Sequence, residues 1–331
     1  MARHDPDATL KLEPPRHGSV GGVRRKTGYI AATAALLVAV AAVGMLAVGV
    51  LSPTPPVPTS TTAPDRVAQS PPGRGETEIL AQRADTLIVG RFGPNRQIVV
   101  LDFPNLTAQG LAFNRMAAFI EKRGMPRDRV LTDSELANAL VLDNSDVATY
   151  YYGHDYRAEE VRRFFSTARK QNLALGLAEQ ELYTILNREG MLADSANLTV
   201  ISIPREGSDP FVDASGRASL LRHELSHGEY FTNPIYASFV RRFWTDEMTA
   251  ADREDFRRFL SQQGYDGDSD DLMANETQAH LMHTTDGRYF NARDCGIPRD
   301  RISALRAVFL AKMPPGWLRD AAIASRPSLP E

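Results

Sequence analysis

Two histidines that lie four residues apart, His223 and His227, are the most chemically specific feature of this sequence. The segment that contains them is expected to be helical, and residues four apart lie on the same face of a helix. Two imidazole nitrogens can therefore bind one zinc ion, while Glu224 lies beside them as a base for a zinc-bound water. These residues predict a metal-dependent hydrolytic site, and they do not specify its substrate.

A catalytic zinc ion requires at least one further protein ligand and an open position for water. Cys295 is the only cysteine in the 331 residues, so neither an intrachain disulfide nor a site with several thiolates can form. The ligands must therefore be histidines and carboxylates.

The expected order of strand, loop and His-Glu-x-x-His helix resembles the zincin metallopeptidases of the glutamate-ligand class. A second segment, NETQA at residues 275–279, is similar to the pattern that carries the third zinc ligand in that class. The resemblance covers roughly residues 195–285 and implies zinc as the cofactor, Glu276 as the third ligand and peptide hydrolysis as the activity. A helical insertion at residues 231–262 would account for the long separation between His227 and Glu276.

Four further side chains are candidates for the chemistry around such a site. The class that the sequence resembles has an aspartate where this chain has His280, four residues after Glu276. His280 could therefore orient a ligand, replace one or contact the substrate, and His283 lies about one turn further along. Tyr230, about one turn after the second motif histidine, is a candidate donor to the developing oxyanion, with Tyr289 as an alternative. Either tyrosine could instead pack at the edge of the core.

The elements that must position these residues follow from the hydrophobic pattern. Strands are expected at residues 97–103 and 198–203, with a weaker one at 86–89. Helices are expected at residues 106–123, 133–142, 156–170 and 178–189, and a further helix carries the two motif histidines. The expected helix caps are Thr132 or Asp133, Asp155, and Asp213 or Ser215. The aromatic run at residues 150–154 is expected to pack beneath the third of these helices.

The N-terminal region has the composition of a membrane anchor. Residues 28–51 carry no charge and are rich in Ala, Val and Leu, which suits a hydrocarbon layer about 30 Å thick. Arg24, Arg25 and Lys26 precede this run, and no Lys or Arg follows it until Arg66. The charges predict a cytoplasmic tail at 1–27, an uncleaved single-pass transmembrane helix at 28–51 and an extracytoplasmic remainder. A cleaved signal peptide and a twin-arginine signal are the alternatives.

Residues 52–76 are rich in Pro, Thr and Ser and predict an extended tether between the anchor and a folded domain at 77–331. The chain carries a net charge of -3, and its charged residues amount to 24%. This balance gives no electrostatic reason to expect a nucleic-acid partner.

These features predict an α+β, zincin-like fold, with a small mixed sheet, an active-site helix and a mainly helical remainder. The expected function is a membrane-anchored zinc peptidase whose partner is a peptide or protein substrate. Two alternatives remain open. One is a non-catalytic cell-envelope binding or scaffold protein with a structural or lost metal. The other is a zinc enzyme that hydrolyses a non-peptide amide, such as cell-wall material.

Overall fold

Four short strands form a mixed sheet in the computed structural model, which describes residues 73–265 and 267–325. The strands are β1 (Ile88–Arg91), β2 (Ile98–Phe103), β3 (His154–Arg157) and β4 (Thr199–Pro204). Their order is β1-β2-β4-β3, with β2 and β4 parallel in the centre and an antiparallel strand at each edge. The two central strands are buried along their whole length, as runs rich in β-branched and apolar residues predict.

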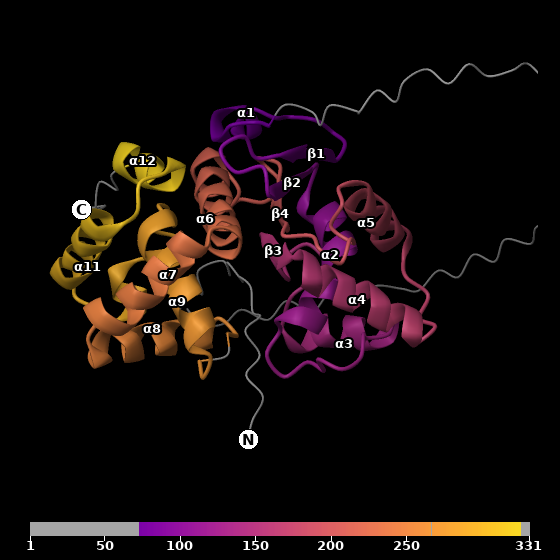
Figure 1. Cartoon of the computed structure of the whole chain (residues 1–331). Coiled ribbons are helices and arrows are strands. Elements are labelled where there is room, and N and C mark those ends of the chain that lie inside the picture. The colour runs from indigo at the N-terminus through magenta and orange to yellow at the C-terminus, as the bar shows by residue number, and fades with distance from the viewer. Residues whose placement is uncertain (1–72, 266, 326–331) are drawn as a thin grey trace, which may run out of the picture. The chain divides into compact units, whose positions relative to one another are not determined.

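Helices from the same part of the chain cover both faces of the sheet (Figure 1). They are α1 (Glu76–Leu80), α2 (Leu106–Ile120), α3 (Asp133–Leu142), α4 (Ala158–Lys170), α5 (Leu177–Arg188) and α6 (Ala214–Thr232). Val99 and Leu101 of β2 pack with α2, α4 and α5, whereas Ile98 and Val100 pack with α6. Successive side chains of a strand point to opposite faces, so one strand contributes to two cores.

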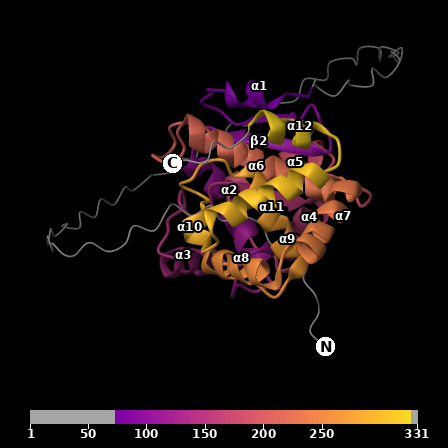
Figure 2. The same ribbon diagram turned by 90° about the vertical axis from the view of Figure 1, so that its left-hand side faces the viewer.

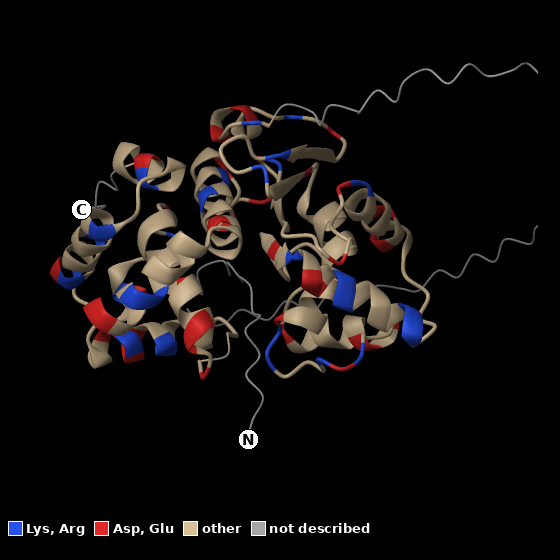
Figure 3. Cartoon of the chain, viewed as in Figure 1, with Lys and Arg blue, Asp and Glu red and all other residues tan. Residues whose placement is uncertain are grey.

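The remainder of the described chain is helical and forms a third core. Its elements are α7 (Pro234–Arg242), the π-helix η1 (Phe243–Glu247), α8 (Ala250–Gln262), α9 (Asp270–Gln278), the π-helix η2 (Ala279–His283), α10 (Ala292–Cys295), α11 (Arg299–Lys312) and α12 (Trp317–Ala324). α11 crosses in front of this group in Figure 2. Acidic and basic residues are interspersed over the described helices, in keeping with the small net charge (Figure 3).

A buried ion pair fixes α6 against the sheet. Arg217 has no exposed surface, and its two terminal nitrogens donate to the carboxylate oxygens of Asp102 at 3.1 and 2.9 Å. The same guanidinium donates to the carbonyl oxygens of Pro204 and Ile79. It therefore connects α6 to β2, β4 and α1 through one planar group with several donors.

Replacing Arg217 with methionine should lower the free energy of unfolding by about 3–5 kcal/mol, because Asp102 would remain buried without its partner. Chemical denaturation followed by circular dichroism measures the change. The matched control is Arg83→Met, which removes the exposed ion pair with Glu206 and should cost less than about 0.5 kcal/mol. Equal effects of the two substitutions would show that the buried pair does not anchor the helix.

The strongest sequence patterns are confirmed by the structure. The strands expected at 97–103 and 198–203 are β2 and β4, and the helix expected at 133–142 is α3. Thr132 caps α3 by accepting a hydrogen bond from the amide of Glu135, and Asp213 caps α6 by accepting one from Gly216 at 2.8 Å. The region expected to hold a helical insertion contains α7, η1 and α8.

The sequence-based assignment around Asp155 is wrong. Asp155 does not cap a helix but lies in β3, and α4 begins three residues later with Arg157 at its N-cap. The weak strand expected at 86–89 is also displaced and forms β1. Both strands have four residues and depend on pairing with a neighbour, so their own sequences show little periodicity.

The predicted cytoplasmic tail, the membrane anchor and most of the linker lie outside the described residues. Within residues 73–265 and 267–325, no helix has the length and apolar character needed to cross a membrane. The amide of Arg74 donates to the carbonyl oxygen of Arg91 at 2.9 Å. Contacts with the sheet region therefore begin a few residues before the predicted domain start at 77.

Candidate metal centre

The middle of α6 carries His223, Glu224 and His227, and none of these side chains is exposed to solvent. α6 can approach the sheet closely because residue 228 is a glycine. A Cβ atom at Gly228 would lie only 2.7 Å from Cδ1 of Ile98 in β2. This close packing holds the two imidazoles against the sheet.

The residues that face α6 come from α9 and η2. The Nε2 atoms of His223 and His227 lie 2.9 Å apart, and Oε2 of Glu276 lies 3.7 Å from Nε2 of His227. In a second grouping, one ligand atom from each of His223, Glu276 and His280 lies within 4.8 Å of the others. Zinc ligands at bond lengths of about 2.0–2.2 Å in a tetrahedral site are roughly 3.3–3.5 Å apart, so these separations suit one ion.

Hydrogen bonds determine the tautomer of both motif histidines. Oγ1 of Thr284 lies 2.6 Å from Nδ1 of His223 and donates its own hydrogen to the carbonyl oxygen of Ala279, so it accepts from the imidazole. Oδ1 of Asn275 lies 3.0 Å from Nδ1 of His227, and an amide oxygen can only accept. Both rings therefore carry their hydrogen on Nδ1 and present the lone pair of Nε2 to the centre of the group, as metal ligands do.

His280 is a buried imidazole that lacks polar partners. Neither of its ring nitrogens has a hydrogen-bond partner among the described residues. Its ring centroid lies 5.0 Å from that of His223, and the rings of Phe259 and Phe290 pack against it. Burial lowers the pKa of His280 to about 3, which keeps the imidazole in the neutral form that binds metals. These contacts favour a ligand, or a neighbour that orients one, over a substrate contact.

Three carboxylates are buried around the histidines. Glu224, Glu276 and Asp155 have no exposed surface. Neither carboxylate oxygen of Glu224 or of Asp155 accepts a hydrogen bond from the described residues. Burial raises the pKa of all three well above the usual range, and the charge of Glu224 raises those of Glu276 and Asp155 further. Buried carboxylates without partners are costly, and a bound divalent cation would offset that cost.

Both candidate tyrosines have structural partners away from the histidines. Tyr230 donates its hydroxyl hydrogen to Asp271, and the guanidinium of Arg241 lies 5.3 Å from its ring centroid. Tyr289 donates to the carbonyl oxygen of Phe211 at 2.5 Å. These contacts argue against the prediction that Tyr230 stabilises an oxyanion. They argue equally against Tyr289 in that role.

Sequence reasoning missed Asp155 as a member of the site. On β3 its Oδ2 lies 3.9 Å from Nδ1 of His227, on the side of the sheet that faces α6. Its neighbour His154 points to the opposite face, where Nδ1 lies 2.7 Å from Oγ of Ser202. A strand of four residues gives too short an alternation to reveal which face each residue occupies.

The main chain at Gly153 lies directly over the carboxylate of Glu224. A Cβ atom at this glycine would lie 2.1 Å from Oε1 of Glu224 and 2.7 Å from its Cδ. The segment is held in place by Gln109, whose Nε2 donates to the carbonyl oxygen of Tyr152 at 3.1 Å. Gly153 is thus part of the wall of the candidate metal centre, whereas Tyr150 and Tyr151 pack in the core that α4 helps to form, as the sequence predicted.

Glu229, five residues after Glu224 on the same helix, faces away from this centre. Its carboxylate accepts hydrogen bonds from Nε1 of Trp317 at 2.7 Å and from Nδ2 of Asn95 at 2.8 Å.

Comparison with known protein families, curated proteins and solved structures finds no match to this chain. The case for a function therefore rests on the chemistry of the site itself.

Proposed function

We propose that the chain is a zinc-dependent peptidase with a zincin-like fold, in which His223, His227 and Glu276 hold the metal. The observation that carries this proposal is the approach of the two Nε2 atoms to 2.9 Å, with the carboxylate of Glu276 3.7 Å from the second. The arrangement of a helix with two ligands across a mixed sheet, faced by a second helix with a third ligand, supports the zincin-like assignment.

In this proposal Glu224 is the general base. A zinc ion bound by the three ligands would lower the pKa of a water molecule and polarise a substrate carbonyl group. Glu224 would take the proton from the attacking water and deliver it to the leaving amine. Burial raises the pKa of Glu224, and a carboxylate with a raised pKa is a stronger base for the proton of the attacking water.

The composition of the N-terminal sequence supports a location outside the cytoplasm for the proposed reaction. A membrane helix at 28–51 and a proline-rich linker would hold the catalytic domain on the extracytoplasmic side. The substrates in reach would be exported peptides and proteins or cell-wall material, because the same attack by water serves peptide and other amide bonds.

One observation favours a second candidate, a non-catalytic envelope protein with a structural metal. All the proposed ligands and Glu224 have no exposed surface, and structural zinc sites are closed whereas catalytic sites keep an accessible position. In the peptidase proposal, part of the chain that encloses the centre must move before a substrate can reach Glu224.

Metal analysis of the purified full chain, together with an assay on a peptide library, tests both candidates. The peptidase proposal expects one zinc per chain, new peptide amino termini, loss of cleavage with a chelator and its recovery when zinc is returned. One tightly bound zinc without cleavage would favour the structural role. A chain that binds no zinc would exclude both forms of the metal site.

Replacing Gly153 with alanine should lower kcat/KM for a cleaved peptide by about 100-fold, because the new methyl group must displace the Glu224 carboxylate. Zinc content should not change, since the methyl group meets Glu224 and not the histidines. Gly75→Ala is the matched control, because its Cβ would be 3.9 Å from the nearest atom. Full activity in Gly153→Ala would mean that Glu224 does not work from the position seen in the structure.

A further inference from the structure

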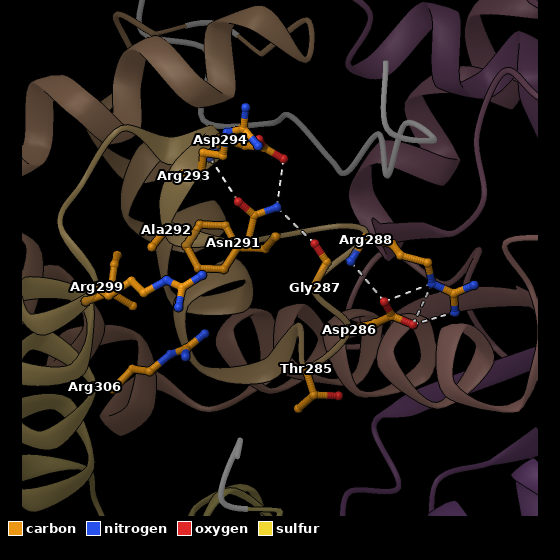
Figure 4. A pocket seen from close by; sticks show the side chains of 12 residues that line it. Thr285, Asp286, Gly287, Arg288, Asn291, Ala292, Arg293, Asp294, Arg299 and Arg306 are labelled. Carbon is orange, nitrogen blue, oxygen red and sulfur yellow. Dashed lines mark hydrogen bonds and ion pairs between the residues drawn. The ribbon is translucent and has the colours of Figure 1, made fainter. Parts of the chain in front are cut away.

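A cavity of about 500 Å³ lies between the loop that follows η2 and the helix α11. Arg293, Arg299 and Arg306 line it, together with the apolar side chains of Phe290 and Ile302 (Figure 4). Its volume is in the range of sites that hold small organic molecules. The cavity lining contains none of the candidate metal ligands, and the ring centroid of one lining residue, Phe290, lies 5.6 Å from that of His280.

The acidic residues at this cavity are already paired. Asp286 binds Arg288, whose guanidinium also reaches Asp213 at 2.6 Å. Asp294 accepts a hydrogen bond from Nδ2 of Asn291 at 2.7 Å. Within the described part of the chain, neither carboxylate forms an ion pair with the other three arginines of the cavity.

Arg306 is the most informative of these three arginines because it is half-buried. Its Nε donates to the carbonyl oxygen of Leu281 at 2.7 Å, which fixes the plane of the guanidinium. Its terminal nitrogens have no carboxylate partner among the described residues, and burial alone lowers its pKa. In Figure 4 the side chains of Arg299 and Arg306 extend in the same direction in the view, and both residues line the cavity. The ring centroid of Phe290 lies 5.9 Å from Cζ of Arg306 and gives the guanidinium a cation–π contact, but a bound anion would supply the counter-charge that it lacks.

The rest of the lining determines what such an anion must carry. Phe290, Ile302 and Ala292 supply the apolar wall of the lining, in which Phe290 and Ile302 are almost fully buried, with 3% and 1% of their surface exposed. A bare inorganic ion would leave this wall and much of the volume unused. A molecule with one anionic end and one apolar group would use both parts of the lining.

We propose that this cavity binds a small organic anion whose carboxylate or phosphate group is held by Arg299 and Arg306, and whose apolar group packs on Phe290 and Ile302. The planar fork of a guanidinium matches both carboxylate and phosphate oxygens. The proposal depends only on the residues of the cavity and is independent of the proposed peptidase activity.

Calorimetric titration of the full chain with matched compounds tests this proposal. N-acetyl-leucine and phenyl phosphate supply the two anionic groups, each with an apolar part. At least one of them should bind, and N-acetyl-leucinamide, which lacks the charge, should bind at least about tenfold more weakly than N-acetyl-leucine if the carboxylate is the ligand. Inorganic phosphate should bind at least about tenfold more weakly than phenyl phosphate if the phosphate ester is the ligand.

The double variant Arg299→Gln/Arg306→Gln should weaken binding by at least about tenfold. Arg123→Gln/Arg188→Gln removes two charges from exposed positions outside the cavity and should change affinity by less than about twofold. Arg299→Gln alone, at an exposed position that should not affect folding, should weaken binding by at least about threefold. Failure of both organic anions to bind, or equal affinity in the double variant and the wild type, would overturn the proposal.

Discussion

Replacing Glu224 with glutamine should reduce peptide hydrolysis by about 10²–10⁴-fold while zinc remains bound. Glutamine has almost the same shape as glutamate but cannot accept and release a proton at neutral pH. His223 and His227 keep their hydrogen-bond partners Thr284 and Asn275 in this variant, so the ligands should stay in place. The measurements are kcat on a cleaved peptide and zinc content in the same preparation.

Glu229→Gln provides the matched control for this experiment. It makes the same chemical change on the same helix, but Glu229 faces Trp317 and Asn95 instead of the histidines. Its kcat should remain within about twofold of the wild type. If Glu224→Gln retained wild-type turnover, the assignment of Glu224 as the base would have to be abandoned even if zinc were present.

Replacing Glu276 with alanine should lower the affinity for zinc by more than about 100-fold, which exceeds the loss typical of residues that only orient a ligand. The two groupings of ligand atoms share His223 and Glu276 and differ in His227 and His280. The proposed set contains His227, so His280→Ala should reduce zinc affinity by only about 10–100-fold. Competition with a chromophoric chelator measures these affinities.

His283→Ala is the control for the metal experiments. His283 lies in the same π-helical segment as His280, but its Nε2 lies 3.3 Å from the hydroxyl of Tyr236. This variant should bind zinc as the wild type does. An equal and large loss in Glu276→Ala and His280→Ala would place His280 among the ligands, and unchanged affinity in Glu276→Ala would remove Glu276 from them.

The parts of the site that could be predicted are those in which one local pattern holds all the information. Four-residue spacing places His223 and His227 on one face of a helix whatever surrounds it. The start of α6 at Asp213 and the fully buried strands β2 and β4 are also local features, because caps and continuous apolar runs can be read from neighbouring residues.

The contacts around the histidines could not be predicted in the same way. Thr284 holds His223 across 61 positions of the chain, and Asn275 holds His227 across 48. Asp155 approaches from a strand of four residues that exists because β4 pairs with it. The structure does not support Tyr230 as an oxyanion donor for a similar reason. Its hydroxyl donates a hydrogen bond to Asp271, a residue of another helix.

Local sequence was enough to predict the proposed chemistry, because it puts two imidazoles and a carboxylate on one helical face, excludes a site with several thiolates and contains an apolar run that predicts an anchor. Which distant residues complete the candidate centre, and how far it is closed, depended on tertiary packing. It brought Glu276, His280 and Asp155 to the motif and laid the main chain of Gly153 over Glu224. The difference arises because helical periodicity acts over a few residues, whereas burial and the contacts between elements depend on how the whole chain packs.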